Sequence, residues 1–175
     1  MSGSVFTTII IAFFLIAAFA VLAFSVLKLV RAIKRILSCE QPKNIVYLLA
    51  FIGCVLFVAA SWIFNMGWLR VILIWVPVPI VHLAIMLALV CKACEVIHLS
   101  QRLKKYTLLS LVTYCAAYLL LPDFGDEGGA YMLFGLIRGD SVATVAFVLA
   151  ALTAVVNICM LIFMNDEMKK LKQVK

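Results

Sequence analysis

Two cysteines, a glutamate and a histidine lie within eight residues near the end of a long apolar segment, as Cys91, Cys94, Glu95 and His98. At about 100° of rotation per helical residue, the four side chains occupy an arc of about 100° on one face. Thiolates, imidazole and carboxylate are ligands for zinc and other divalent metals. The pattern therefore raises the hypothesis of metal- or thiol-dependent chemistry at this position.

Helix packing accounts for the same residues. Cysteine is a small apolar residue that packs well inside helices, and Lys92 and Glu95 have the i,i+3 spacing of a surface ion pair. A single CxxC without a second pair of ligands does not define a metal site. Cys39 and Cys159, which we place at a similar depth, are candidates for further ligands. We favour packing over metal binding.

The composition of the chain indicates a membrane protein. Hydrophobic residues make up 67% of the 175 residues, charged residues make up 13%, and the mean hydropathy is +1.21. A soluble domain is about half apolar and one quarter charged. We therefore predict an all-α polytopic integral membrane protein with a single domain. The net charge of +7 does not indicate nucleic-acid binding, because the basic residues flank the apolar segments and form no single basic face.

Apolar runs separated by polar or basic residues predict a bundle of five transmembrane helices. The fourth run has only about 16 residues against the ~20 that span hydrocarbon, so Lys104 and Lys105 are expected to snorkel at its start. A basic tail at 165–175 follows the last span. The five predicted spans are about 5–30, 45–64, 76–99, 106–121 and 142–164.

The distribution of basic residues predicts the orientation of these spans. With five spans, thirteen of the 15 Lys and Arg residues fall on one side, and only Arg70 and Arg138 fall on the other. Loops on the cytoplasmic side carry the excess of Lys and Arg. The N-terminus is therefore expected outside and the C-terminus in the cytoplasm, in a plasma or inner membrane.

His82 lies in the outer half of the predicted third span, about 180° around the helix from Cys91. An ionisable residue inside a membrane is a candidate for function, but a proton relay needs an acidic partner at the same depth and none is present. We expect a neutral imidazole bonded to a carbonyl freed by Pro77 or Pro79. Polar groups on opposite faces predict that this span is the centre of the bundle.

The predicted outer loop, 122–141, concentrates charge and glycine. It contains Asp123, Asp126, Glu127 and Asp140, with Arg138 as the expected counter-charge. Clustered carboxylates in an ordered loop are suited to a divalent cation, a basic peptide or a lipid headgroup. A solvated connector with glycine turns is an equal alternative.

A stripe of small residues marks the last predicted span. Small side chains let helices approach closely, and an amide inside a membrane finds a partner across such an interface. We expect this packing within the bundle, although contact between chains stays open. The stripe consists of Ala143, Ala146, Ala150 and Ala154 and leads to Asn157.

The sequence contains no catalytic triad pattern, phosphate-binding glycine loop or HExxH motif. The function that we expect is non-catalytic: an accessory or regulatory protein that contacts the lipid bilayer or another membrane protein, with homo-oligomers left open. A small transporter or oligomeric pore is one alternative. A membrane enzyme that uses the Cys91 cluster is the other, and only this alternative involves a cofactor, a divalent metal.

Overall fold

The computed structural model describes residues 45–64, 67–75, 78–124, 130–134 and 136–173, and eight single positions between 16 and 34. The described residues are mostly helical, and three of their helices are long and apolar enough to cross a membrane. These findings support the predicted class, an α-helical membrane protein. Most of the first predicted span, 5–30, lies outside the described residues.

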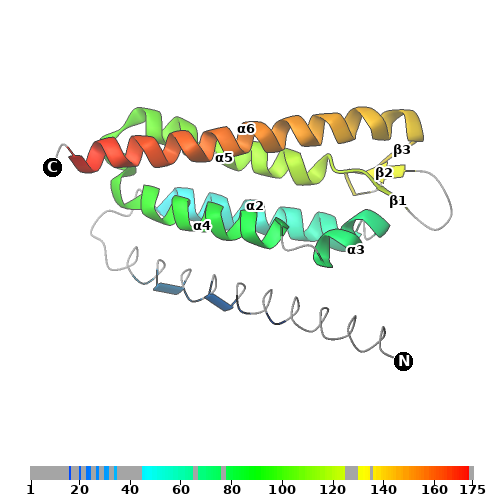
Figure 1. The fold of residues 1–175 in the computed structure, drawn as a ribbon, viewed down its shortest axis with the longest axis horizontal. Coiled ribbons are helices and arrows are strands. Elements are labelled where there is room, and N and C mark those ends of the chain that lie inside the picture. Colours follow the sequence, from blue (N-terminus) through cyan, green and yellow to red (C-terminus); the bar gives the residue numbers. More distant parts are fainter. Residues whose placement is uncertain are drawn as a thin grey trace, which may run out of the picture.

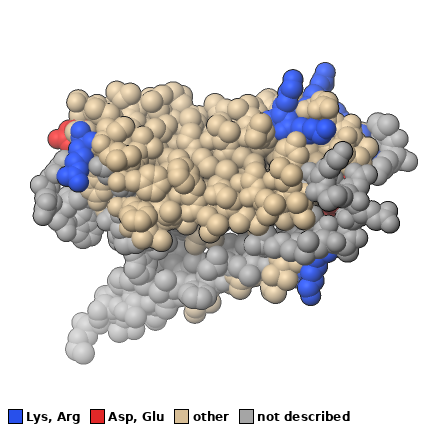
Figure 2. All heavy atoms as spheres, turned by 180° about the vertical axis from the view of Figure 1, so that it is seen from behind, with Lys and Arg blue, Asp and Glu red and all other residues tan. Residues whose placement is uncertain are grey.

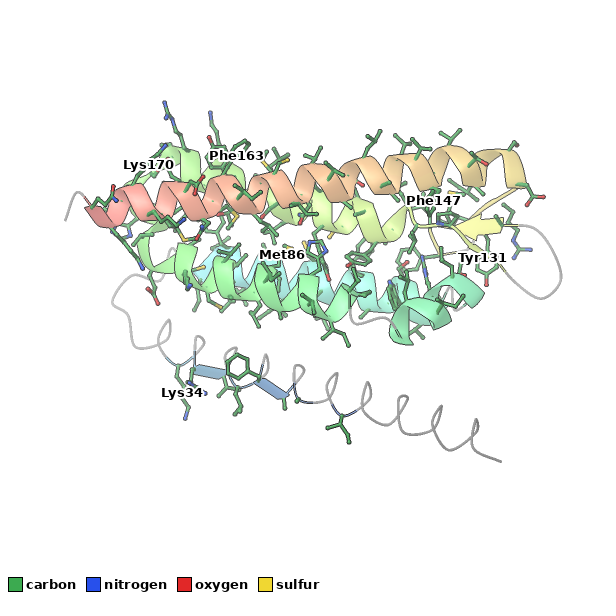
Figure 3. All side chains as sticks on the ribbon, viewed as in Figure 1. Lys34, Met86, Tyr131, Phe147, Phe163 and Lys170 are labelled. Atoms are coloured by element: carbon green, nitrogen blue, oxygen red, sulfur yellow. The ribbon has the colours of Figure 1, made fainter. Side chains whose placement is uncertain are left out.

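Four long helices run alongside one another, with a short helix and three short strands at one end of the bundle and the C-terminus at the other (Figure 1). In Figure 3, Met86 lies inside this bundle, whereas Tyr131 and Lys170 lie toward its opposite ends. The elements are α2 (Ile45–Phe64), α3 (Trp68–Trp75), α4 (Val78–Val96), η2 (Ile97–Leu99), α5 (Gln101–Leu119), β1 (Asp123–Phe124), β2 (Ala130–Met132), β3 (Ile137–Arg138) and α6 (Asp140–Gln173).

The three candidate membrane spans coincide with the predicted second, third and fifth spans. They are Ile45–Phe64, Val78–Leu99 and Asp140–Gln173. At about 1.5 Å per residue, the 34 residues of α6 extend over about 51 Å, beyond the ~30 Å of a hydrocarbon core. In Figure 2, charged side chains gather toward the ends of the molecule, and the surface between them is uncharged.

The fourth predicted span is a helix, α5, but it is not among the three candidate spans. Three basic residues lie in its first turns, and its buried face carries hydroxyl groups. Several of these hydroxyls bond to carbonyl groups of α5 itself, as in Thr107 Oγ1 to Leu103 O at 2.8 Å and Ser110 Oγ to Thr107 O at 2.8 Å. A polar face of this kind is suited to contact with protein and lowers the hydropathy of the segment.

The expectation that the third span is the centre of the bundle stays a prediction, because most of the first predicted span lies outside the described residues. The packing between α5 and α6 is the most extensive in the described part of the chain, and α5 also packs against α2 and η2. Thr107, Ser110 and Ala117 are small buried residues on α5, so its neighbours approach closely. Contacts between α4 and α5 are few.

The outer loop folds into a three-stranded antiparallel sheet in the order β1-β2-β3. Met132 pairs with Ile137 across a turn in which Leu133 and Phe134 have positive φ values of 49° and 62°. The buried side chains Ala130 and Met132 pack together with Ala143 and Ala146 of α6. The all-α prediction missed this sheet because its strands are only two or three residues long.

Candidate functional site: a groove between α4 and α6

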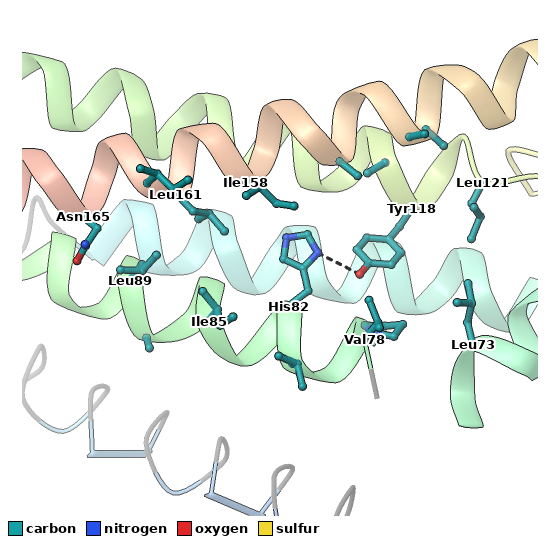
Figure 4. Close-up of a pocket in the computed structure, with 18 of the residues that line it drawn as sticks. Leu73, Val78, His82, Ile85, Leu89, Tyr118, Leu121, Ile158, Leu161 and Asn165 are labelled. Carbon is teal, nitrogen blue, oxygen red and sulfur yellow. Dashed lines mark hydrogen bonds between the residues drawn. The ribbon is translucent and has the colours of Figure 1, made fainter. Parts of the chain in front are cut away.

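An apolar groove of about 900 Å³ lies between α4 and α6, and residues of α5 contribute to its lining (Figure 4). Its volume falls within the ~300–1,000 Å³ that is typical of small-molecule sites. Leu73 and Leu121 lie toward one end of the groove, and Asn165 lies at the other. The walls are formed mainly by aliphatic side chains, among them Val78, Val81, Ile85, Leu89, Ile158, Leu161 and Ile162.

Small residues on the facing helices leave the space that forms the groove. On α6, Ala150, Ala151 and Ala154 belong to the lining, and Ala88 does so on α4. The predicted alanine stripe is therefore divided along α6. Its first two members pack with β2, whereas Ala150 and Ala154 border the groove.

Three polar side chains from three different helices meet beside the groove. The Nε2 atom of His82, on α4, lies 2.7 Å from Oδ1 of Asn157, on α6. Its Nδ1 atom lies 3.1 Å from the hydroxyl of Tyr118, on α5, and the dashed line in Figure 4 marks this hydrogen bond. His82 and Tyr118 belong to the groove lining and are partly exposed, whereas Asn157 is fully buried behind them.

Contacts with α5 hold the Asn157 amide in place. Its Nδ2 atom donates to the carbonyl of Ser110 at 2.5 Å and to Oγ1 of Thr113 at 3.0 Å. The bonds of His82 correct the sequence-based expectation, which assigned it a backbone carbonyl near the prolines. Its partners are the two side chains Asn157 and Tyr118.

The face of α4 that carries His82 contains the one sequence signal that points to the groove. Val78, His82, Ile85 and Leu89 recur at helical spacing and all line it. Periodicity alone does not separate such a face from one that packs against a neighbouring helix or against lipid. The groove therefore becomes visible only in the folded chain.

The four residues of the predicted metal cluster differ in burial in this structure. Cys94 is buried in the main core, Cys91 is partly buried, and Glu95 and His98 are exposed. Within the described ranges, no three His, Cys, Asp or Glu side chains come together as metal ligands. A shared helix face is not sufficient, because these side chains reach environments that differ in depth.

Asp123, predicted to bind a ligand in the outer loop, is fully buried and joins β1 to α3. Its carboxylate accepts hydrogen bonds from the backbone N–H groups of Gly67 and Leu69, each at 2.9 Å. The Nε atom of Arg70 lies 3.5 Å from the same carboxylate, and Arg70 also donates to the Ser61 carbonyl at 2.6 Å. Burial lowers the pKa of Arg70, and the charge of Asp123 opposes part of this effect. This pair is built into the fold and has no exposed surface for an external ligand.

The other charged residues of the outer loop have separate surroundings. Asp140, at the start of α6, accepts a hydrogen bond from the Ala130 N–H at 3.1 Å, and Arg138 is exposed. Asp126 and Glu127 lie outside the described residues. The counter-charge for Asp123 is thus Arg70, and the expectation that assigned this role to Arg138 is wrong for that carboxylate.

No protein-family model, curated protein or solved structure gives a significant match to this chain. The chemistry of the groove is therefore the guide to what this chain binds. Its walls are mostly apolar. Among the described lining residues, His82 is the only histidine, and none is an Asp, Glu, Lys or Arg. This arrangement is suited to a molecule with a long apolar body and one polar group.

Proposed function

We propose that this chain is a small multi-pass membrane protein that acts by non-catalytic binding of a lipid-like amphiphile in the groove between α4 and α6. The observation that carries the proposal is an apolar groove of about 900 Å³ with a hydrogen-bonded polar site beside it. Both bordering helices are candidate membrane spans, so a ligand can enter from the lipid phase. Binding of this kind is compatible with an accessory or regulatory role toward another membrane protein.

We also propose five spans, with the N-terminus outside and the C-terminus in the cytoplasm of a plasma or inner membrane. A hydrogen bond of 2.7 Å from Ser100 Oγ to Glu167 Oε1 joins the η2–α5 junction to the end of α6. The proposal draws support from the basic residues near this junction, because cytoplasmic ends carry the excess of positive charge. They are Arg102, Lys104, Lys105, Lys169, Lys170 and Lys172.

The nature of the lining favours binding over passage of ions. An ion path needs polar or charged groups along its whole length, whereas the described lining of the groove is mostly aliphatic. Each ring nitrogen of His82 already has a partner within the protein. A lipid-like molecule needs only apolar contact along most of its length, and the groove offers that contact.

Filling the groove tests the proposal. The probe is 1-hexadecanol, and the assay is native mass spectrometry of the full chain in lipid nanodiscs. Ala154→Phe places a phenyl ring in the groove, and we expect affinity to fall about tenfold. A tenfold loss corresponds to ~1.4 kcal/mol, close to the burial of two methylene groups.

Val155→Phe is the matched control, because Val155 is the next residue on α6, is 59% exposed and is not part of the lining. We expect its affinity for 1-hexadecanol to stay within about twofold of wild type, the effect of a surface change of ~0.5 kcal/mol or less. Saturable binding at one site by the wild type is the supporting result. Uptake that does not saturate, or equal loss in both variants, would refute the proposal.

A further inference from the structure

The hydrogen bonds of Asn157 fix the orientation of its amide. The Ser110 carbonyl can only accept, and the Thr113 hydroxyl has its own acceptor in the Leu109 carbonyl at 2.8 Å. Both groups therefore require the NH₂ side of the amide, which Asn157 directs toward them. Its Oδ1 atom then faces His82 as an acceptor.

This orientation determines the tautomer of His82. Because Oδ1 of Asn157 can only accept, Nε2 of His82 carries the proton in the 2.7 Å bond. In a neutral imidazole the other nitrogen has no proton, so Nδ1 accepts. Tyr118 therefore donates its hydroxyl proton to Nδ1 across 3.1 Å.

Beside His82 the described lining of the groove therefore offers a ligand hydrogen-bond acceptors and no free donor. The Tyr118 hydroxyl donates its one proton to His82. The lone pairs of the Tyr118 oxygen can still accept a hydrogen bond from a further partner. The proton on His82 Nε2 is directed to the buried Asn157. The remaining polar side chain of the lining, Asn165, lies at the far end of the groove (Figure 4).

We propose that the ligand of the groove is a neutral lipid alcohol, whose hydroxyl group donates a hydrogen bond to the Tyr118 oxygen. This inference rests on the proposed function and names its ligand class. An ether or a simple ester supplies no proton for that bond. A carboxylate is also an acceptor and would bring an unpaired charge into apolar surroundings at a high cost.

The groove accommodates the apolar body of such an alcohol on the Asn165 side of Tyr118. From His82 to Leu89 the α4 wall rises about 10 Å, and α6 faces it with Ile158 and Leu161. These side chains are branched and apolar, as a hydrocarbon chain requires. The hydroxyl group would lie beside Tyr118 and the chain along α4 and α6.

The test compares 1-hexadecanol with 1-methoxyhexadecane, which has the same chain but no hydroxyl proton. In the nanodisc assay we expect the ratio of the two affinities to fall about 3- to 10-fold in Tyr118→Phe relative to wild type, the worth of one neutral hydrogen bond. The binding of the ether itself should not change, which shows that the variant is folded. Tyr106→Phe is the control, because Tyr106 packs on Phe163 and is not part of the lining.

The outcomes separate this inference from the proposed function. If Tyr118→Phe leaves the affinity ratio unchanged while Ala154→Phe still weakens the binding of both probes, the hydroxyl bond to Tyr118 is refuted and the groove stands as a binding site. If the wild type binds neither probe saturably, both proposals are overturned. An equal fall of the ratio in Tyr106→Phe would also refute a specific bond to Tyr118.

Discussion

Replacing Asn157 by leucine is the sharpest perturbation of this bundle. The side chain is fully buried in α6 and forms hydrogen bonds to residues of both α4 and α5. Leucine has a similar size but no polar atoms, so the change removes the bonds with little change in packed volume. It leaves the Nε2–H group of His82 without its acceptor.

The expected loss follows from the three bonds. Hydrogen bonds between membrane helices contribute ~0.6 kcal/mol on average and up to ~1.7 kcal/mol. Three such bonds give ~2 kcal/mol, and the unpaired His82 N–H adds up to a few kcal/mol if no other group replaces Asn157. We therefore expect Asn157→Leu to lower the free energy of unfolding by ~2–4 kcal/mol.

The measurement is reversible unfolding in mixed micelles with increasing SDS, followed by tryptophan fluorescence. Asn165→Leu is the control on the same helix, and we expect a change below ~0.5 kcal/mol because Asn165 lies at the end of the groove, partly exposed. A double-mutant cycle with His82→Leu should give a coupling energy of ~0.6–1.7 kcal/mol. Strict additivity of His82→Leu and Asn157→Leu would refute the bond between the two side chains.

Two further predictions concern the ends of the bundle and use the same unfolding assay. Arg70→Met leaves the buried carboxylate of Asp123 without its counter-charge and should lower the free energy of unfolding by ~3–5 kcal/mol. Adding Asp123→Asn should recover part of that loss. A double variant whose loss equals the sum of the two single losses would contradict the ion pair. Ser100→Ala removes the donor to Glu167 and also the N-cap of α5, because the Ser100 hydroxyl accepts from the Leu103 N–H at 3.3 Å. It should lower the free energy of unfolding by ~1–2 kcal/mol, and by less in a Glu167→Ala background; an equal loss in both backgrounds would contradict the bond to Glu167.

The membrane class and three of the helices could be predicted from the sequence, because they depend on local composition. A run of about 20 apolar residues is sufficient to indicate a span, and α2, α4 and α6 carry such runs. The extensive packing of α5 against α6 could not be predicted in this way. Thr107 and Ser110 lower its hydropathy, and the same small side chains allow its close packing.

The partners of the polar side chains were decided by the tertiary structure. His82 and Asn157 were both conspicuous in the sequence, as polar groups in apolar segments, but 75 residues separate them. Asp123 likewise stood out as a loop carboxylate, and its partner Arg70 lies more than 50 residues earlier in the chain, on α3. Hydropathy and spacing record the depth and face of each residue, whereas a hydrogen bond depends on which faces meet, and only the folded chain determines that.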